Sequence, residues 1–282
     1  SRARDSWSDH PMKFISLVSA AASVGGLLAG SAAAQEAVLP HETFTLQSAA
    51  LGEARRINVW TPPGYAEGRT RFPVLYMPDG GVEEDFPHVV ATVDSAVRAG
   101  EMRPVIVVGI ENTQRRRDMT GPTTVARDSA IAPRVGGSAA FRRFIAGELM
   151  PEVRRRYRVT DETAIIGESL AGLFVLETFF LQPELFDTYI ALSPSLWWNN
   201  EELVRTAAGH LRAHRRMRAA LFLSSAGDDI GPEAARLAEV LRANAPSGLR
   251  WAYVPRPDLQ HSTIYRASAP QVLREWLPPR RR

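Results

Sequence analysis

The stretch TAIIGESLAGLF, residues 163–174, decides the fold. Residues 164–166 are apolar and typical of a short buried strand, and residues 170–180 repeat apolar and small side chains at helical spacing. A strand that becomes a helix within three residues forces the corner residue, Ser169, into a cramped backbone conformation. Gly167 and Ala171 stand two residues before and two after Ser169, where a larger side chain would collide with the turn. The sequence therefore predicts a strand–turn–helix corner with a serine at its apex.

This corner matches the nucleophile elbow of the α/β-hydrolases, G-x-S-x-G, with alanine in the last place. The turn lifts the Ser169 hydroxyl above the sheet, and the N–H of Leu170 at the helix N-terminus is placed to stabilise an oxyanion. A serine hydroxyl needs a base to take its proton, so the elbow predicts a histidine and an orienting carboxylate further along the chain. A small-x-Ser-x-small pentapeptide is also common without any function, but the flanking strand and helix favour the hydrolase interpretation.

The composition is that of an ordinary globular protein. The chain has 282 residues, of which 45% are apolar and 23% charged, which suits one large α/β domain. Its formal net charge is +3 and its pI about 9.6, and its basic residues are almost all arginine. Lys13 is the only lysine, which leaves no Schiff-base lysine and no Ser-Lys dyad in the chain that follows. The arginine runs 154–156 and 280–282 are not interleaved with aromatics, so no nucleic-acid partner is expected.

Residues 12–34 have the pattern of a secretory signal peptide: Met12 and Lys13, an apolar run over 14–30, and a small-residue cleavage site over 31–34. Residues 1–11 are interpreted as an upstream extension and residues 35–282 as a single domain. The apolar run is short and rich in Gly and Ser, so no membrane span is expected in the mature chain. The absence of cysteine excludes disulfides and a lipoprotein attachment site. These features predict a periplasmic or secreted bacterial enzyme and leave its oligomeric state open.

Apolar runs and turn residues divide the mature chain into alternating strands and helices. Strands are predicted over 42–48, 54–61, 71–77, 104–110, 164–166, 188–192, 219–225 and 249–254. Helices are predicted over 86–99, 138–157, 170–180, 201–214, 232–244 and 267–277, with a long polar loop over 111–137. A loop of this length inside a domain is usually functional or mobile. The alternation predicts an α/β-hydrolase fold, with one doubly wound, mostly parallel sheet and helices on both of its faces.

The base is sought among three histidines, because in this fold the nucleophile, the acid and the histidine follow one another along the chain. His210 and His214 are one helical turn apart among arginines and are interpreted as a solvated helix face; a metal pair is the alternative, which no nearby carboxylate spacing supports. His261 lies in a predicted loop after the last strand, at the edge of the sheet where ligands bind. We therefore predict His261 as the base.

The acid is expected after the strand 219–225, where Gly227-Asp228-Asp229 follows. Asp229 is the preferred residue, with Asp228 as the alternative and Glu233 as an outside candidate. The second oxyanion donor is expected to be a backbone N–H after the strand 71–77, from Gly80 or Gly81, because glycine lets the backbone approach a substrate closely.

Several segments together resemble the putative esterase family, which includes esterase D, trilactone siderophore esterases, feruloyl esterases and the mycobacterial mycolyltransferases. The segments are YMPDG (76–80), GIENT (109–113) with Arg117-Asp118, the elbow with GLF (172–174), SPSLWW (193–198) and HST (261–263). They occur in the family's order over residues 43–277, and the siderophore esterases look most similar, through GIENT and SPS. The resemblance implies that Ser169 is the nucleophile and His261 the base, and that no metal or cofactor is needed.

Two positions depart from the family pattern. The family commonly has His before the nucleophile and Gly two residues after it, where this chain has Glu168 and Ala171. Glu168 is interpreted as a buried carboxylate paired with an arginine; alternatively it contributes to the charge of the active site. The acid position also varies in the family, so the resemblance implies Ser169 and His261, while Asp229 rests on its place after the strand 219–225.

The substrate pocket is expected between the loop 111–137, the pair Trp197 and Trp198, and the loop that carries Asp258. Two adjacent tryptophans suit stacking on an aromatic or sugar-like group, or else one of them is core and the other a surface lid. The arginines of the loop, Arg117 among them, suit an anionic substrate such as a catecholate, although a solvated loop and a structural ion pair with Asp118 are the alternatives.

The sequence as a whole predicts a serine esterase that works through an acyl-enzyme on siderophore-type or aromatic acyl esters. Its partner would be a small-molecule ester. An acyltransferase of the same fold and a non-catalytic binding protein remain the alternatives.

Overall fold

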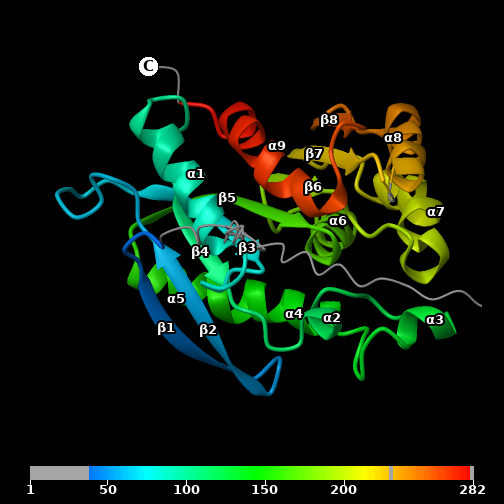
Figure 1. The fold of residues 1–282 in the computed structure, drawn as a ribbon, viewed down its shortest axis with the longest axis horizontal. Coiled ribbons are helices and arrows are strands. Elements are labelled where there is room, and N and C mark those ends of the chain that lie inside the picture. The colour runs from blue at the N-terminus through cyan, green and yellow to red at the C-terminus, as the bar shows by residue number, and fades with distance from the viewer. Residues whose placement is uncertain (1–37, 229–230, 280–282) are drawn as a thin grey trace, which may run out of the picture. The chain divides into compact units, whose positions relative to one another are not determined.

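The computed structural model describes residues 38–228 and 231–279. These residues build an eight-stranded sheet in the order β1-β2-β4-β3-β5-β6-β7-β8 (Figure 1). The strands are β1 (Glu42–Ser48), β2 (Glu53–Trp60), β3 (Phe72–Pro78), β4 (Ile106–Ile110), β5 (Val159–Glu168), β6 (Thr188–Leu192), β7 (Ala219–Ala226) and β8 (Leu249–Arg256). β1 and β2 pair antiparallel, as do β2 and β4, and every other pair is parallel. The predicted mostly parallel sheet is confirmed.

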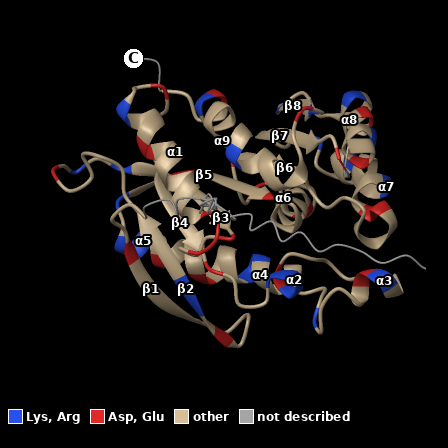
Figure 2. Cartoon of the chain, in the orientation of Figure 1, with Lys and Arg blue, Asp and Glu red and all other residues tan. Residues whose placement is uncertain are grey.

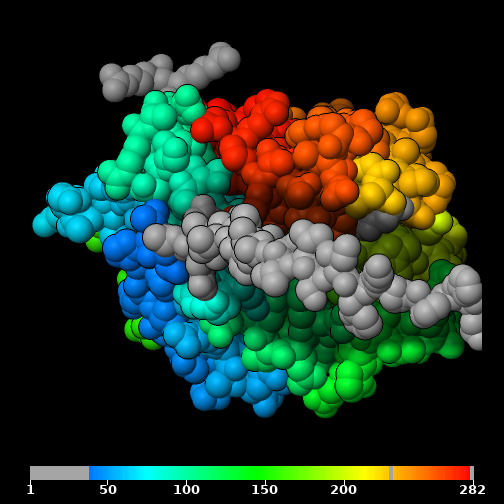
Figure 3. Space-filling model, in the orientation of Figure 1, coloured from blue at the N-terminus to red at the C-terminus, as the bar shows by residue number. Residues whose placement is uncertain are grey.

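Helices cover both faces of this sheet, as predicted. One face carries α1 (Phe86–Arg98) and α9 (His261–Trp276), which contact each other and form adjoining surfaces in Figure 3. The other face carries α4 (Ser138–Phe144), η1 (Ile145–Leu149), α5 (Met150–Arg156), α6 (Leu170–Leu181), α7 (Trp198–Ala213) and α8 (Gly231–Asn244). Neighbouring residues of the central strands alternate between the two cores: Tyr76 and Val108 pack on the α6 side, Leu75 and Val107 on the α1 side. Such two-sided burial explains their unbroken apolar sequences. In the described part of the chain, no helix is both long and apolar enough to cross a membrane.

The helices differ from the sequence-based prediction in three places. The predicted loop 111–137 contains two short helices, α2 (Arg115–Asp118) and α3 (Ala126–Ser129). The single helix expected over 138–157 is divided by the π-helical turn η1. α9 begins at His261 rather than at 267, because Gln260 and Thr263 form a capping box: the Gln260 side chain accepts the N–H of Thr263, and the Thr263 side chain accepts the N–H of Gln260.

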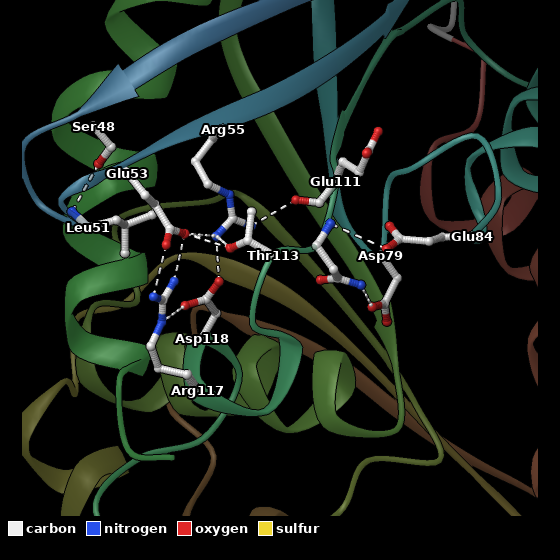
Figure 4. Close-up of polar contacts among 11 residues, drawn as sticks. Ser48, Leu51, Glu53, Arg55, Asp79, Glu84, Glu111, Thr113, Arg117 and Asp118 are labelled. Atoms are coloured by element: carbon white, nitrogen blue, oxygen red, sulfur yellow. Dashed lines mark hydrogen bonds and ion pairs between the residues drawn. The ribbon is translucent and has the colours of Figure 1, made fainter. Parts of the chain in front are cut away.

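A buried cluster of ion pairs ties the segment after β4 to β2 (Figure 4). Arg55 and Asp118 have fully buried side chains and pair with each other, and Arg55 also donates to Glu53 at 3.2 Å and to Thr113 at 3.1 Å. Both terminal nitrogens of Arg117 donate to the Glu53 carboxylate, at 3.0 and 2.7 Å, and its Nε donates to Asp118 at 2.6 Å. Figure 2 shows charged residues of both signs at this end of β2 and along α2. The cluster thus holds the beginning of the segment that follows β4 against β2.

The cluster makes the stability of the folded protein depend on pH in the acidic range. The hydrogen bond from Arg117, against the opposing effect of burial, lowers the pKa of Glu53 from 4.5 to about 2, with help from Thr113 and from the charges of Arg117 and Arg55. A carboxylate with a lowered pKa stabilises the fold above its unfolded pKa, and the contribution disappears as pH falls through the folded value. We therefore expect Glu53→Gln to destabilise the protein at pH 6 and to differ less from wild type as pH falls from about 4.5 toward 2.

Urea unfolding of both proteins at a series of pH values measures this difference. The comparison variant is Glu239→Gln, which removes an exposed carboxylate paired with Arg242 and should match wild type at every pH. A gap between wild type and Glu53→Gln that stayed constant down to pH 2.5 would show that the Glu53 charge is not what stabilises the cluster.

Candidate active site

The corner between β5 and α6 holds Ser169 in a strained conformation. Its φ is 61° and its ψ −122°, in the left-handed half of the map that non-glycine residues rarely adopt. The backbone is locked there because the Ser169 N–H donates to the Leu192 carbonyl at 3.1 Å, and the Ser169 carbonyl accepts from the N–H groups of Leu173 and Ser195 at 2.9 and 3.0 Å. A Cβ on Gly167 would lie 2.7 Å from the carbonyl carbon of Ala171, so only glycine fits before the turn.

Ser169 and His261 are brought together by this corner and by the start of α9. The Ser169 hydroxyl lies 3.0 Å from Nε2 of His261. His261 is the first residue of α9, and its backbone N–H donates to both carboxylate oxygens of Asp228 at 2.9 and 3.0 Å. The geometry lets the Ser169 hydroxyl donate its proton to the ring, as a serine nucleophile requires.

Three strained residues mark one edge of the sheet. Asp79, Ser169 and Ser193 have φ values of 54°, 61° and 41°, and each directly follows the last residue of a parallel strand, β3, β5 or β6. These three strands are neighbours in the sheet. Strained non-glycine residues at the carboxyl ends of adjacent strands are typical of functional sites in open α/β sheets.

Among the described residues, the imidazole of His261 also lies close to Ser193 and Glu168. Its Nδ1 lies 3.1 Å from the hydroxyl of Ser193, which also accepts the Ala226 N–H at 3.3 Å. Its Nε2 lies 3.0 Å from Oε1 of Glu168. The sequence placed Ser193 in a motif without assigning it a role, because neither its left-handed φ nor the direction of its hydroxyl is visible in the letters SPS. The available signal was its position directly after a buried strand.

The predicted acids are placed differently from one another. Asp229, the preferred acid, lies outside the described residues, so its role stays a prediction. Asp228, the alternative, binds the backbone N–H of His261 and thereby caps the start of α9. Glu233 is in the first turn of α8 and pairs with Arg236 at 3.4 Å.

The predicted oxyanion donors are all backbone N–H groups near this edge. Leu170 is the first residue of α6, so its N–H has no acceptor within the helix. The N–H of Gly80 donates to the Ile110 carbonyl at 2.9 Å, which holds the chain after β3 against β4. The N–H of Gly81 donates to the Glu84 carboxylate at 2.7 Å, so this donor is already hydrogen-bonded to a carboxylate oxygen. Burial raises the pKa of Glu84, against the lowering effect of the N–H groups of Gly81 and Asn112.

The predicted substrate-binding residues fall into two groups. Trp198 is 5% exposed and donates its indole N–H to the Gly121 carbonyl at 3.0 Å, so it belongs to the core. Trp197 is half-buried and lies edge-on to Trp198, with ring centroids 5.9 Å apart. All three guanidinium nitrogens of Arg117 make ion pairs in the cluster with Glu53 and Asp118. The side chains of Trp198 and Arg117 are therefore used in contacts within the protein that hold the fold together.

A basic cavity adjoins this edge of the sheet. Its volume is about 510 Å³, and its lining consists of Gln114, Arg115, Arg116, Arg117, Ala132, Pro133 and Arg134. Arg115 links the cavity to the site, because its guanidinium binds Asp79 with two hydrogen bonds of 2.6 and 2.8 Å. Burial opposes the charge of Arg115, but the contacts with Asp79 outweigh it and raise the pKa, with a smaller contribution from Glu168. Across residues 38–228 and 231–279, no three His, Asp or Glu side chains come together as a metal site.

Comparison with known proteins shows what the sequence and the fold are similar to. The family model described as putative esterase matches residues 48–229. The chain is 34% identical over 165 residues to the ferri-bacillibactin esterase BesA of Bacillus subtilis. The matched region covers 51% of this chain and 54% of that protein. It is 32% identical over 188 residues to the siderophore enterobactin esterase of Emericella nidulans, covering 59% of this chain and 58% of that protein.

Solved structures extend the similarity to most of the fold. The crystal structure of an IroE-like serine hydrolase from Shewanella oneidensis superposes with a TM-score of 0.77 at 25% identity, covering 84% of this chain and 80% of that one. The matched region spans only a little over half of the length of each of the two curated relatives.

Proposed function

The chain belongs to the putative esterase family, and from this premise we propose that it is a serine esterase that hydrolyses carboxylic esters through an acyl-enzyme. Ser169 Oγ attacks the ester carbonyl while its proton passes to Nε2 of His261. The imidazolium then gives that proton to the departing alkoxide as the acyl C–O bond breaks. Water attacks the acyl-enzyme with His261 again as the base, and the proton returns to Ser169 as the acid product leaves.

The observation that carries this proposal is the 3.0 Å contact between the Ser169 hydroxyl and Nε2 of His261 at a strained strand–helix corner. The N–H groups of Leu170 and Gly81 are the oxyanion donors we propose, with the Glu84 carboxylate displaced from Gly81 when substrate binds; Gly80 supports the loop. Asp229 remains the proposed acid. The predicted signal peptide, which lies outside the described residues, supports our proposal that the enzyme acts in the periplasm or outside the cell.

We further propose that the substrate is a siderophore-type ester with an anionic aromatic acyl portion. Of the two curated relatives, one is named a siderophore enterobactin esterase and the other a ferri-bacillibactin esterase. The cavity next to the site is lined by four arginines, and Arg116 and Arg134 lie on its exposed side. Guanidinium groups bind oxyanions and stack on aromatic rings, and both interactions suit a ferric catecholate. Trp197, half-buried beside Trp198, is the aromatic surface we assign to this substrate.

Replacing Arg116 and Arg134 with alanine tests the substrate class. We expect each variant to raise the KM for the ferric complex of a catecholate trilactone about fivefold, because each loses about 1 kcal/mol of charge attraction. The KM for neutral p-nitrophenyl butyrate should not change. The matched control is Arg143→Ala, which removes an exposed arginine of α4 outside the cavity and should leave both substrates unaffected.

Steady-state assays on the purified chain from Gln35 onward provide these constants. Equal KM changes for both substrates would contradict the anionic class while leaving the esterase intact. A folded wild-type protein that consumed neither substrate would overturn the esterase itself. Transfer of the acyl group to added alcohols in preference to water would identify an acyltransferase instead.

A further inference from the structure

We propose that the protein has a second binding surface, at the edge of the sheet opposite the candidate active site, which docks on the anionic headgroups of a lipid bilayer. A cavity of about 560 Å³ marks this surface. Four arginines line the cavity, and we call them the arginine face: Arg212, Arg215, Arg216 and Arg218. The arginine face takes no part in the proposed ester hydrolysis, and its binding can be measured without any ester.

The positive charge of the arginine face is not neutralised within the protein. All four side chains are exposed, and across residues 38–228 and 231–279 none of their guanidinium groups makes a hydrogen bond or an ion pair. The arginine run on α5 differs, because Arg155 and Arg156 both donate to the Glu152 carboxylate at 2.6 Å. Among the described residues that line the cavity, Glu184 is the only acid, so positive charge is in excess there. An external anion can therefore bind these guanidinium groups.

The dipole of α7 explains only part of this cluster. The helix ends at Ala213, and cations in the last turn of a helix are stabilised by the partial negative charge of its carbonyl end. This effect falls off beyond the last turn and accounts for Arg212. The other three arginines lie past the end of α7, in the connection to β7. Their gathering around one cavity is not needed to stabilise the helix.

An exposed apolar side chain beside the cavity favours lipid over other anions. Leu181 is the last residue of α6 and is 41% exposed, and Pro183, two residues further on, lines the cavity. A bilayer interface accepts apolar side chains together with cationic ones. Free phosphate and nucleic acids offer no apolar phase, and none of the described residues lining the cavity is a Phe, Tyr or Trp on which a base could stack. An anionic lipid surface matches both the charge and the exposed leucine.

The sheet separates the arginine face from the candidate active site. Glu184 precedes β6 and Arg218 precedes β7, so both lie at the amino ends of parallel strands. Ser169 follows β5 at the carboxyl end of the neighbouring strand. β6 has five residues, which places roughly 16 Å of strand between the two edges. A protein docked through the arginine face would therefore keep the Ser169 edge open to solvent.

Vesicle sedimentation tests the charge of the arginine face. The purified chain from Gln35 onward, which keeps every described residue, should bind vesicles of equal parts phosphatidylglycerol and phosphatidylcholine and should not bind pure phosphatidylcholine. Binding should weaken as salt screens the charges. In the double variant Arg215→Gln and Arg218→Gln we expect the partition coefficient to fall about thirtyfold, because each arginine near an anionic surface contributes about fivefold.

The matched control removes the same charge from another surface. Arg143 of α4 and Arg154 of α5 are also exposed and also make no ion pair with the described residues, and neither lines the cavity. The double variant Arg143→Gln and Arg154→Gln should bind anionic vesicles like wild type. Both double variants should hydrolyse p-nitrophenyl butyrate at the wild-type rate, since none of the four side chains lies at the candidate active site.

A fluorescent label tests which side of the protein meets the bilayer. The sequence contains no cysteine, so Leu181→Cys and Val254→Cys each introduce a single labelling site. The two natural side chains are equally exposed, at 41% and 42%, but Val254 lies near the carboxyl end of β8. With anionic vesicles, the emission of a polarity-sensitive dye at position 181 should shift to shorter wavelength, and that of the dye at position 254 should not change.

Several results would overturn this docking surface whether or not the protein hydrolyses esters. They are a wild-type protein that does not bind the anionic vesicles, equal losses of binding in the two double variants, and a dye at position 254 that responds as strongly as the dye at position 181. Displacement from vesicles by inorganic pyrophosphate at constant ionic strength would identify a soluble phosphate compound as the ligand instead. Tighter binding to a short DNA duplex than to the vesicles would identify nucleic acid.

Discussion

Replacing Ser169 with alanine is expected to lower kcat/KM for ester hydrolysis by at least about a thousandfold. In the proposed mechanism the Ser169 hydroxyl forms the acyl-enzyme, and it lies 3.0 Å from Nε2 of His261, which takes its proton. The oxyanion donors and the substrate cavity remain in the variant, so the residual rate should stay above that of water alone. Steady-state hydrolysis of p-nitrophenyl acetate and butyrate measures the loss, and a burst of p-nitrophenol, where wild type shows one, should disappear.

We expect this substitution to leave the fold and its stability unchanged, so that a loss of activity can be assigned to the missing hydroxyl. Thermal unfolding of Ser169→Ala is expected to match wild type, since one methyl-sized side chain occupies the same turn. Ser224→Ala is the matched control, because Ser224 is a buried serine whose hydroxyl has no hydrogen-bond partner among the described residues. It should keep full activity. If Ser169→Ala stayed within tenfold of wild type, the nucleophile would have to lie elsewhere.

Replacing Asp118 with alanine is expected to lower the free energy of unfolding by about 3–5 kcal/mol. The side chains of Asp118 and Arg55 are both fully buried, so the variant leaves the Arg55 guanidinium buried with one carboxylate fewer (Figure 4). Arg117 loses the partner of its Nε at the same time. Urea unfolding followed by circular dichroism measures the change. The value is large because the loss arises from an uncompensated buried charge and not from the missing attraction alone.

Two further variants test that explanation. Arg55→Met combined with Asp118→Ala should be less destabilised than the sum of the two single variants, since the double variant buries no unpaired charge at this pair. Asp94→Ala breaks a helical pair with the exposed Arg98 and should be destabilised much less than Asp118→Ala. Equal losses in Asp118→Ala and Asp94→Ala would mean that burial does not set the strength of the Arg55 cluster.

Much of the fold could be predicted from local sequence. Strands 42–48 and 188–192 agree with the structure to the residue, because each is bounded by turn residues and reads as a strand without help from elsewhere. β5 begins at Val159, five residues before the predicted start, because its polar first half becomes a strand only by pairing with β3. The π-helical turn η1 is likewise non-local: Glu148 within it accepts the Ala50 N–H at 2.9 Å. No pattern within 138–157 contains that contact.

The candidate site also has a part that local sequence predicts and a part that depends on contacts between distant segments. Ser169 and His261 could be found from the strand–helix corner and from the position after the last strand, and the structure places them in contact. The roles of Ser193 and Asp228 depend on where side chains point: one faces the ring of His261 and the other its backbone. Two aspartates in a row look equivalent in sequence. For Arg117 and Trp198 the sequence leaves two interpretations open, and the structure shows the structural ones: an ion pair between Arg117 and Asp118, and a core position for Trp198.

The positive φ angles at Asp79, Ser169 and Ser193 also bear on how this protein can evolve. A strained residue raises the free energy of the native state, so mutations to glycine or asparagine there relieve strain, and a screen for heat resistance would enrich them. The same mutations would remove the groups that line the reacting edge of the sheet. Adaptation to higher temperature is therefore confined to positions away from these three strand ends, and thermostable descendants should keep all three residues while changing around them.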